Sequence, residues 1–315
     1  MEKDKQQTVP NVLNRLAQIL GTEIKNNRLE IPTEFGNGYC TGFVFNEHIR
    51  MLISNYELNE ELVVENPDIN ASKRMIFFKF QNIFPKTEIL SIEMPSVLVA
   101  TSSMNTDDFI SIHTNTAVIN IEVDATYLNG LVDLSEKSPV LQSLLQNTQP
   151  LLFEQLIFPS IRKIVDEIVN EPVDKAFELF FFRIKAEELI CRLLMELEKR
   201  DEKHLYALNS QDIQILYKVK EQMLAHPETP PVINVLADFA NMSATKLKRL
   251  FRQIFGNSIF SYYQEFRMKE AARLLKEENL SVSDVGYRLG FTNLSHFSRV
   301  FEEHIGMKPK QYSRT

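Results

Sequence analysis

The sequence LKRLFRQIFG at residues 247–256 returns fifty residues later, at residues 297–306, as FSRVFEEHIG. The apolar, basic and glycine positions of the two stretches fall in register, which indicates a duplicated helical unit. Each copy has the pattern of a short helix, a tight turn and an amphipathic helix that carries an arginine, which is the arrangement of a helix-turn-helix. Two such units on one chain indicate a protein that contacts two neighbouring stretches of DNA groove.

The first unit begins with a short predicted helix over residues 232–240, and Asn241 follows in the turn, where a positive φ is required and asparagine tolerates it. Ser243 is placed to cap a second helix that runs to Phe255, and Gly256 ends it. The apolar residues of this helix follow helical spacing and must face inward: Leu247, Leu250, Phe251 and Ile254. The outward arc therefore holds Thr245, Lys246, Lys248, Arg249 and Arg252.

The second unit begins at Ser281, which forms a predicted capping pair with Asp284 for a short helix to Leu289. Gly290 occupies the turn, which is one residue longer than in the first unit. Either Thr292 or Asn293 caps a helix to about Ile305, whose core side carries Phe297, Val300 and Phe301. The residues left outside are Asn293, Ser295, His296 and Arg299. One long helix over residues 258–277 joins the two units and fixes the distance between them.

The outward side chains suit distinct contacts with double-stranded DNA. Arg249 and Lys248 can bond the O6 and N7 atoms of guanine, Thr245 can add a methyl or hydroxyl contact, and Arg299 is the matching candidate in the second unit. Arg252 and Lys308 are better placed for phosphates. Arg267 is expected to make an ion pair or a helix cap inside the domain. Because Glu302 and Glu303 reduce the positive charge of the second helix, we predict stronger DNA reading by the first.

Charge is segregated along the chain, whose net charge is −7 over 315 residues. Residues 1–206 hold 20 Lys and Arg against 31 Asp and Glu, a net −11, whereas residues 207–315 hold 15 against 11, a net +4. This asymmetry, with a linker or helix break marked by the charged residues 196–203 and the polar Asn209 and Ser210, predicts two domains, 1–206 for effector binding and dimerisation and 207–315 for DNA binding.

The first domain changes character along its length, so the predicted fold class is α+β. Short β-rich runs suggest an antiparallel sandwich or small barrel, at residues 39–45, 49–53, 62–64, 75–80, 97–101 and 117–123. Helical periodicity follows at residues 137–147, 151–169 and 174–200. The third of these helices either offers one side to a second subunit, as in a homodimer, or packs wholly inside its own domain.

Several classes of protein are disfavoured by what the sequence lacks. It has no apolar run of eighteen residues, and its N-terminus is charged. Both features predict a cytoplasmic protein without a membrane segment. Its two cysteines, Cys40 and Cys191, cannot build the zinc and nucleophile site of a DNA-repair methyltransferase, and no hydrolase, phosphate-loop or metalloprotease motif occurs. His48 and His113 stand without neighbouring ligands. We therefore expect no enzyme, no metal and no cofactor.

The C-terminal pattern closely resembles the AraC/XylS family of bacterial transcription regulators. The resemblance covers about a third of the chain, from Leu236 to Arg314, and includes residues 247–251, Gly256, residues 290–291, residues 297–301, Gly306, Pro309 and Tyr312. It implies a seven-helix domain that places two recognition helices in adjacent major grooves and acts on transcription initiation, usually as an activator that contacts RNA polymerase. Two positions depart from the family pattern, Asn241 for glycine in the first turn and Gly286 for alanine in the second unit.

The resemblance also implies an N-terminal domain that binds a small effector, commonly on a cupin-like fold. The run from Met242 to Phe251 is similar to members that respond to ferric siderophores. An alternative is a ligand-independent regulator whose N-terminal domain serves only dimerisation or contact with another protein. Five phenylalanines either line an apolar effector pocket or form ordinary core, the latter being favoured: Phe43, Phe45, Phe77, Phe78 and Phe80.

Overall fold

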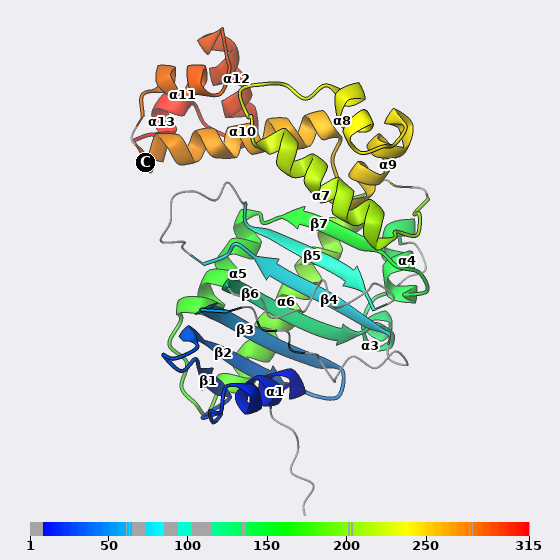
Figure 1. Cartoon of the computed structure of the whole chain (residues 1–315), viewed down its shortest axis with the longest axis vertical. Coiled ribbons are helices and arrows are strands. Elements are labelled where there is room, and N and C mark those ends of the chain that lie inside the picture. Colours follow the sequence, from blue (N-terminus) through cyan, green and yellow to red (C-terminus); the bar gives the residue numbers. More distant parts are fainter. Residues whose placement is uncertain are drawn as a thin grey trace, which may run out of the picture. The chain divides into compact units, whose positions relative to one another are not determined.

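The computed structural model describes residues 9–60, 62, 64, 74–84, 94–102, 115–133, 137–200, 202, 204–276, 278 and 280–314. Its internal contacts divide the chain into two compact units, Met1–Ser210 and Gln211–Thr315, which we call unit 1 and unit 2. The boundary expected from the sequence, between residues 206 and 207, lies close to this division. The two units are described separately below (Figure 1).

Unit 1 is built on one antiparallel sheet of seven strands in the order β1-β2-β3-β6-β4-β5-β7. The strands are β1 Arg28–Glu30, β2 Gly36–Val44, β3 Ile49–Leu58, β4 Met75–Gln81, β5 Ser96–Thr101, β6 Asn115–Asp124 and β7 Leu152–Leu156. The late strand β6 lies between β3 and β4 and pairs with both. Strand β6 therefore joins β1, β2 and β3 on one side to β4, β5 and β7 on the other.

The two faces of this sheet carry different side chains because successive residues of a strand point to opposite sides. On β6, Ile119, Ile121 and Val123 are fully buried in the main core, whereas Glu122 points the other way and pairs with Arg50 of β3 at 2.5 Å. Four helices cover the apolar face, namely α3 Ala125–Leu131, α4 Pro139–Gln146, α5 Pro159–Asn170 and α6 Glu178–Glu198. The opposite face is covered near β1 to β3 by α1 Asn11–Ile19 (Figure 1).

The described strands differ from the predicted sandwich or cupin-like barrel. They form a single sheet, and among the described residues no ladder joins the edge strands β1 and β7. The place of a second sheet is taken by amphipathic helices. Helix α5 buries Ile161, Ile164, Val165 and Ile168 against the sheet, and α6 buries seven residues along its length.

Several predicted elements need correction. The helix expected over residues 151–169 is strand β7 followed by α5, because Pro159 stands at the first turn of a new helix and so marks its start. Residues 62 and 64 are described without strand structure, although Val64 is buried beside α1. Helix α6 begins at Glu178 instead of residue 174. Helices α1 and α3 and strand β1 were not anticipated.

The five phenylalanines considered from the sequence are buried, and His48 packs against an aromatic ring. Phe43, Phe45, Phe78 and Phe80 lie in the main core, and Phe77 is buried on the opposite side of β4, so the core interpretation is confirmed. The ring of His48 stacks on that of Tyr127 at 4.8 Å between centroids, and its Nε2 lies 3.5 Å from Glu47. His113 lies outside the described residues.

Unit 2 consists of helices only in its described residues. They are α7 Ser210–Leu224, α8 Ile233–Phe239, α9 Ala244–Phe255, α10 Ile259–Lys276, α11 Val282–Arg288, α12 Leu294–Ile305 and α13 Pro309–Tyr312. Helix α10 contacts α9 of the first pair and α11, α12 and α13 beyond it, as the predicted connecting helix requires. None of the helices described in the chain is long and apolar enough to cross a membrane.

Candidate nucleic-acid interface

Helix α9 is oriented by its caps and by its apolar side. The Ser243 hydroxyl accepts a hydrogen bond from the Lys246 amide at 3.2 Å, and Gly256 ends the helix with φ +74°. The four residues predicted to face inward are at most 2% exposed, which confirms that orientation: Leu247, Leu250, Phe251 and Ile254. The opposite arc is exposed at Thr245, Lys248, Arg249 and Arg252.

Lys246 differs from the other predicted contacts on α9. Its ammonium nitrogen lies 2.9 Å from a carboxylate oxygen of Asp212, on α7, and the lysine side chain is 41% exposed. This ion pair partly neutralises Lys246 and holds it toward α7. The arc also carries the cationic side chains of Lys248, Arg249 and Arg252. Sequence reasoning missed the pair because 34 residues separate its two members.

Helix α12 repeats this construction with a different cap. The side-chain oxygen of Asn293 accepts hydrogen bonds from the amides of Ser295 at 2.9 Å and His296 at 3.0 Å. Asn293 is thus the N-cap, and only its NH₂ group remains to contact DNA. Phe297, Val300 and Phe301 are buried as predicted. The exposed arc consists of Ser295, His296 and Arg299.

The two helix pairs, α8 with α9 and α11 with α12, have different residues at the positions where their helices pack closely. The first pair places Ala237 on α8 and Ala244 on α9, whereas the corresponding positions of the second pair hold Gly286 and Leu294. A Cβ atom at Gly286 would lie 2.7 Å from Cδ2 of Leu294 and 3.3 Å from Cδ1 of Phe297. The glycine found in place of the family's usual alanine therefore makes room for Leu294, and the two changes offset each other.

Both turns contain a residue in the left-handed region, Asn241 at φ +51° and Gly290 at φ +78°. Asparagine adopts this conformation more readily than other side-chain-bearing residues, so Asn241 can replace the family's glycine. Gly290 has a further constraint, because an added Cβ would lie 2.2 Å from the backbone oxygen of Glu228. Only glycine allows the second turn to pack against the segment between α7 and α8.

Arg267 holds the second pair to α10 from inside the unit. It is 6% exposed, and its guanidinium donates hydrogen bonds to the backbone oxygen of Leu289, at the end of α11, and to Gln264. Its charge also lies 4.1 Å from the centre of the Phe291 ring. Burial lowers the pKa of this guanidinium. The predicted intradomain role is confirmed, in the form of a cap on α11.

Lys308 belongs to neither α9 nor α12. It is exposed and stands at the N-cap of α13, where its backbone oxygen accepts hydrogen bonds from the amides of Gln311 and Tyr312 at 2.9 Å. The ten predicted contacts therefore come from three places in unit 2, the outward arcs of α9 and α12 and the start of α13.

Comparison with known proteins identifies this unit. A family model described as a helix-turn-helix domain matches residues 236–315. Residues 236–315 form an AraC-type helix-turn-helix domain. Two curated relatives of the AraC-type domain are HTH-type transcriptional regulators. GbdR from Pseudomonas aeruginosa is 32% identical over 108 residues, covering 34% of this chain and 29% of GbdR. GlxA from Rhizobium meliloti is 33% identical over 99 residues, covering 31% of each chain.

A longer match and a solved structure extend this comparison. The transcriptional activator RhaR from Escherichia coli is 28% identical over 155 residues, covering 48% of this chain and 52% of RhaR. A crystal structure of an AraC-type regulator from Chromobacterium violaceum is 28% identical with a TM-score of 0.31, covering 34% of this chain and 95% of that one. The chain spans less than a third of the length of GbdR and GlxA.

Proposed function

We propose that this chain is a sequence-specific DNA-binding regulator of transcription that reads double-stranded DNA with α9 and α12. The observation that carries the proposal is the duplicated helix pair, in which each capped second helix buries an apolar side and exposes an arginine-bearing arc. The matched transcriptional regulators support it. Arg249 and Arg299 are assigned to base edges, and Arg252 and Lys308 to phosphates.

A mobility-shift titration tests these roles on a DNA fragment from upstream of the chain's own gene or a neighbouring gene. Loss of one bidentate base contact costs about 1–3 kcal/mol, or roughly 5- to 150-fold in affinity. Arg249→Ala and Arg299→Ala should each fall in this range. Arg162→Ala removes the same charge from α5 in unit 1, where Arg162 pairs with Asp166, and should bind like the parent chain. Unchanged specific binding by both unit 2 variants would refute the assignment.

A contact with RNA polymerase is proposed for the exposed side of α8. Val232, Val235 and Phe239 are 45–59% exposed and share one side of this helix. The corresponding positions beside α11 hold Ser281, Asp284 and Arg288. The second helix pair has no apolar residues at these positions, so packing within a pair does not require them. The exposed apolar side of α8 therefore supports a contact with another protein.

Activation of transcription through that contact is measured in a purified transcription assay. Val235→Asp should retain DNA affinity and lose most of the transcription activation. Ser283→Asp, at an exposed position on α11 of the second helix pair, should retain both. A Val235→Asp chain that activates normally would remove α8 from the proposal. Repression instead of activation by the parent chain would change the sign of the regulation and leave the DNA-binding roles intact.

A homodimer is proposed through the start of α6. Phe177, Phe180 and Ile184 follow helical spacing on one side and are 64%, 65% and 44% exposed. This apolar side supports the expectation that the long helix offers one side to a second subunit. Sedimentation velocity should show a dimer for the parent chain and a monomer for Phe180→Glu. The control is Ile19→Glu, at an apolar position at the end of α1 that is 46% exposed, and it should remain a dimer. A monomeric parent would contradict the dimer.

An effector response is proposed for unit 1, with a ligand-independent regulator as the alternative. The separation of an acidic unit from a basic one supports it. A thermal-shift screen of metabolites on the full chain distinguishes the two, and a ferric siderophore belongs in that screen because of the sequence resemblance. A ligand that raises the unfolding temperature and changes DNA affinity supports the response. Consistent absence of shifts favours the alternative.

A further inference from the structure

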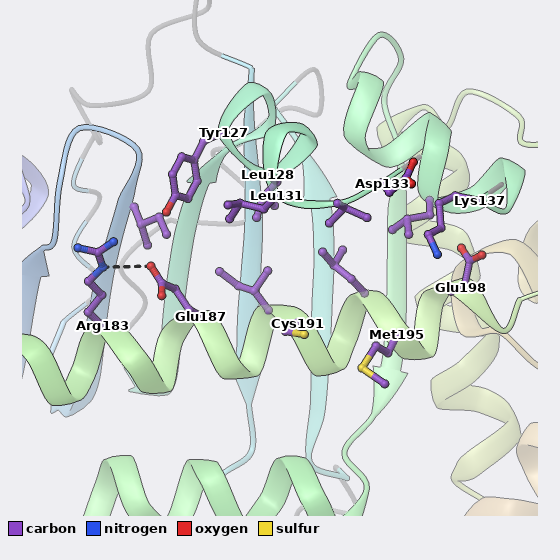
Figure 2. A pocket seen from close by; sticks show the side chains of 15 residues that line it. Tyr127, Leu128, Leu131, Asp133, Lys137, Arg183, Glu187, Cys191, Met195 and Glu198 are labelled. Carbon is purple, nitrogen blue, oxygen red and sulfur yellow. Dashed lines mark hydrogen bonds and ion pairs between the residues drawn. The ribbon is translucent and has the colours of Figure 1, made fainter. Parts of the chain in front are cut away.

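Unit 1 contains a cavity of about 590 Å³ between α3, the start of α4 and α6 (Figure 2). Binding sites for small molecules commonly have volumes of about 300–1,000 Å³. The cavity lies among the helices that cover the apolar face of the sheet. None of the five phenylalanines considered from the sequence lines it. Its size and position make it a candidate ligand site.

The middle of the cavity is apolar. Leu128, Leu141, Ile190 and Leu194 are 2–5% exposed and form its wall, with each of α3, α4 and α6 contributing. At the mouth, Leu131 is 62% exposed although it is a large apolar residue. An apolar ligand would remove this side chain from water, which favours binding by about 25 cal/mol for each Å² buried.

The two ends of the cavity are polar (Figure 2). At one end Tyr127 lies near Arg183, whose Nε donates to Glu187 at 3.0 Å. This hydrogen bond is the main cause of the raised pKa of Arg183. At the other end are Lys137, Asp133 and Glu198. A ligand of matching shape therefore has an apolar middle and hydrogen-bonding groups toward its ends.

The charges of the lining distinguish among such ligands. Three carboxylates face two cations, and Arg183 is already paired with Glu187. Glu198 accepts hydrogen bonds from the amide and hydroxyl of Ser138, the N-cap of α4, at 3.1 and 2.9 Å. A carboxylate on the ligand would add a fourth negative charge to this lining. An uncharged or cationic group would not.

We propose that this cavity binds an elongated apolar molecule whose polar end is uncharged or cationic. The inference deepens the effector response proposed for unit 1 and rests on it for any effect on transcription. Binding itself is independent of the DNA-reading roles of unit 2. Failure of ligand binding in the cavity and failure of the effector response can therefore be distinguished by experiment.

Cys191 provides a direct measurement because it is exposed and lines the cavity. The chain's other cysteine, Cys40, is 1% exposed, and burial raises the pKa of its thiol to about 12. Alkylation of the folded full chain by iodoacetamide should therefore modify Cys191. A ligand in the cavity slows this reaction by a factor of 1 + [L]/Kd, about tenfold at ten times Kd.

Three ten-carbon probes separate the head-group charges: decan-1-ol, decylamine and decanoate, each used below its micelle concentration. We expect decanol and decylamine to protect Cys191 and decanoate to protect it far less. Leu131→Glu should abolish protection by decan-1-ol, and Ile19→Glu, an exposed apolar position on α1 away from the cavity, should retain it. Equal protection by decanoate would overturn the ligand class. No protection by any probe, or unchanged protection in Leu131→Glu, would overturn the site.

Discussion

Replacing Gly290 with alanine tests how the second helix pair is held in unit 2. Two effects add at this position. The left-handed backbone costs an L-residue about 1–2 kcal/mol. The new Cβ would also lie 2.2 Å from the backbone oxygen of Glu228, and relief of such an overlap in a packed region costs about 1–3 kcal/mol. We therefore expect Gly290→Ala to destabilise the second pair by about 2–5 kcal/mol.

Gly306 is the matched control because its φ is +86° and a Cβ there meets nothing within 4 Å. Gly306→Ala should cost only the backbone contribution, about 1–2 kcal/mol. Native-state hydrogen exchange of the α12 amides in the full chain measures both variants. The difference of about 1–3 kcal/mol corresponds to roughly 5- to 150-fold faster exchange in Gly290→Ala. Equal exchange in the two variants would show that the contact with Glu228 does not hold the turn.

Three further predictions concern unit 2. Gly286→Ala should lower the free energy of unfolding by about 1 kcal/mol or more, since the added methyl overlaps the end of the Leu294 side chain. Combining it with Leu294→Ala should relieve the overlap. Strictly additive effects in this double-mutant cycle would contradict the account. Arg267→Met should lower the stability of α10 to α12 by about 2–4 kcal/mol through lost hydrogen bonds and the ring contact, without changing the salt dependence of DNA binding. Arg252→Ala and Lys308→Ala should each reduce the slope of log affinity against log salt by about 0.9 and leave sequence preference unchanged; an altered preference would place them on bases.

The helices of unit 2 could be predicted from the sequence because their signals are local. Ser243 and Ser281 cap helices where expected, and Gly256 and Gly306 end helices in the left-handed conformation. The repeat supplied a second check, since three of the four inward positions of α9, Leu247, Leu250 and Phe251, have buried counterparts on α12. Such signals require no knowledge of which distant segments meet.

The sheet of unit 1 could not be derived in the same way. Strand positions were largely visible, but the pairing of β6 with both β3 and β4 joins segments far apart in the chain. Strand β7 was hidden because its apolar residues run directly into α5, and Pro159 was the available signal for the boundary. Within the candidate interface, the pair of Lys246 with Asp212 likewise depends on a distant segment.

The central claim is that α9 and α12 read DNA unequally. It is tested most directly by competitive binding titrations of Arg249→Ala and Arg299→Ala against the specific site and a scrambled fragment, at one fixed salt concentration. The account predicts that both variants lose specificity and that Arg249→Ala loses more affinity, because Lys248 and Arg252 reinforce the first arc while Glu302 and Glu303 oppose the second. A larger loss in Arg299→Ala would contradict it.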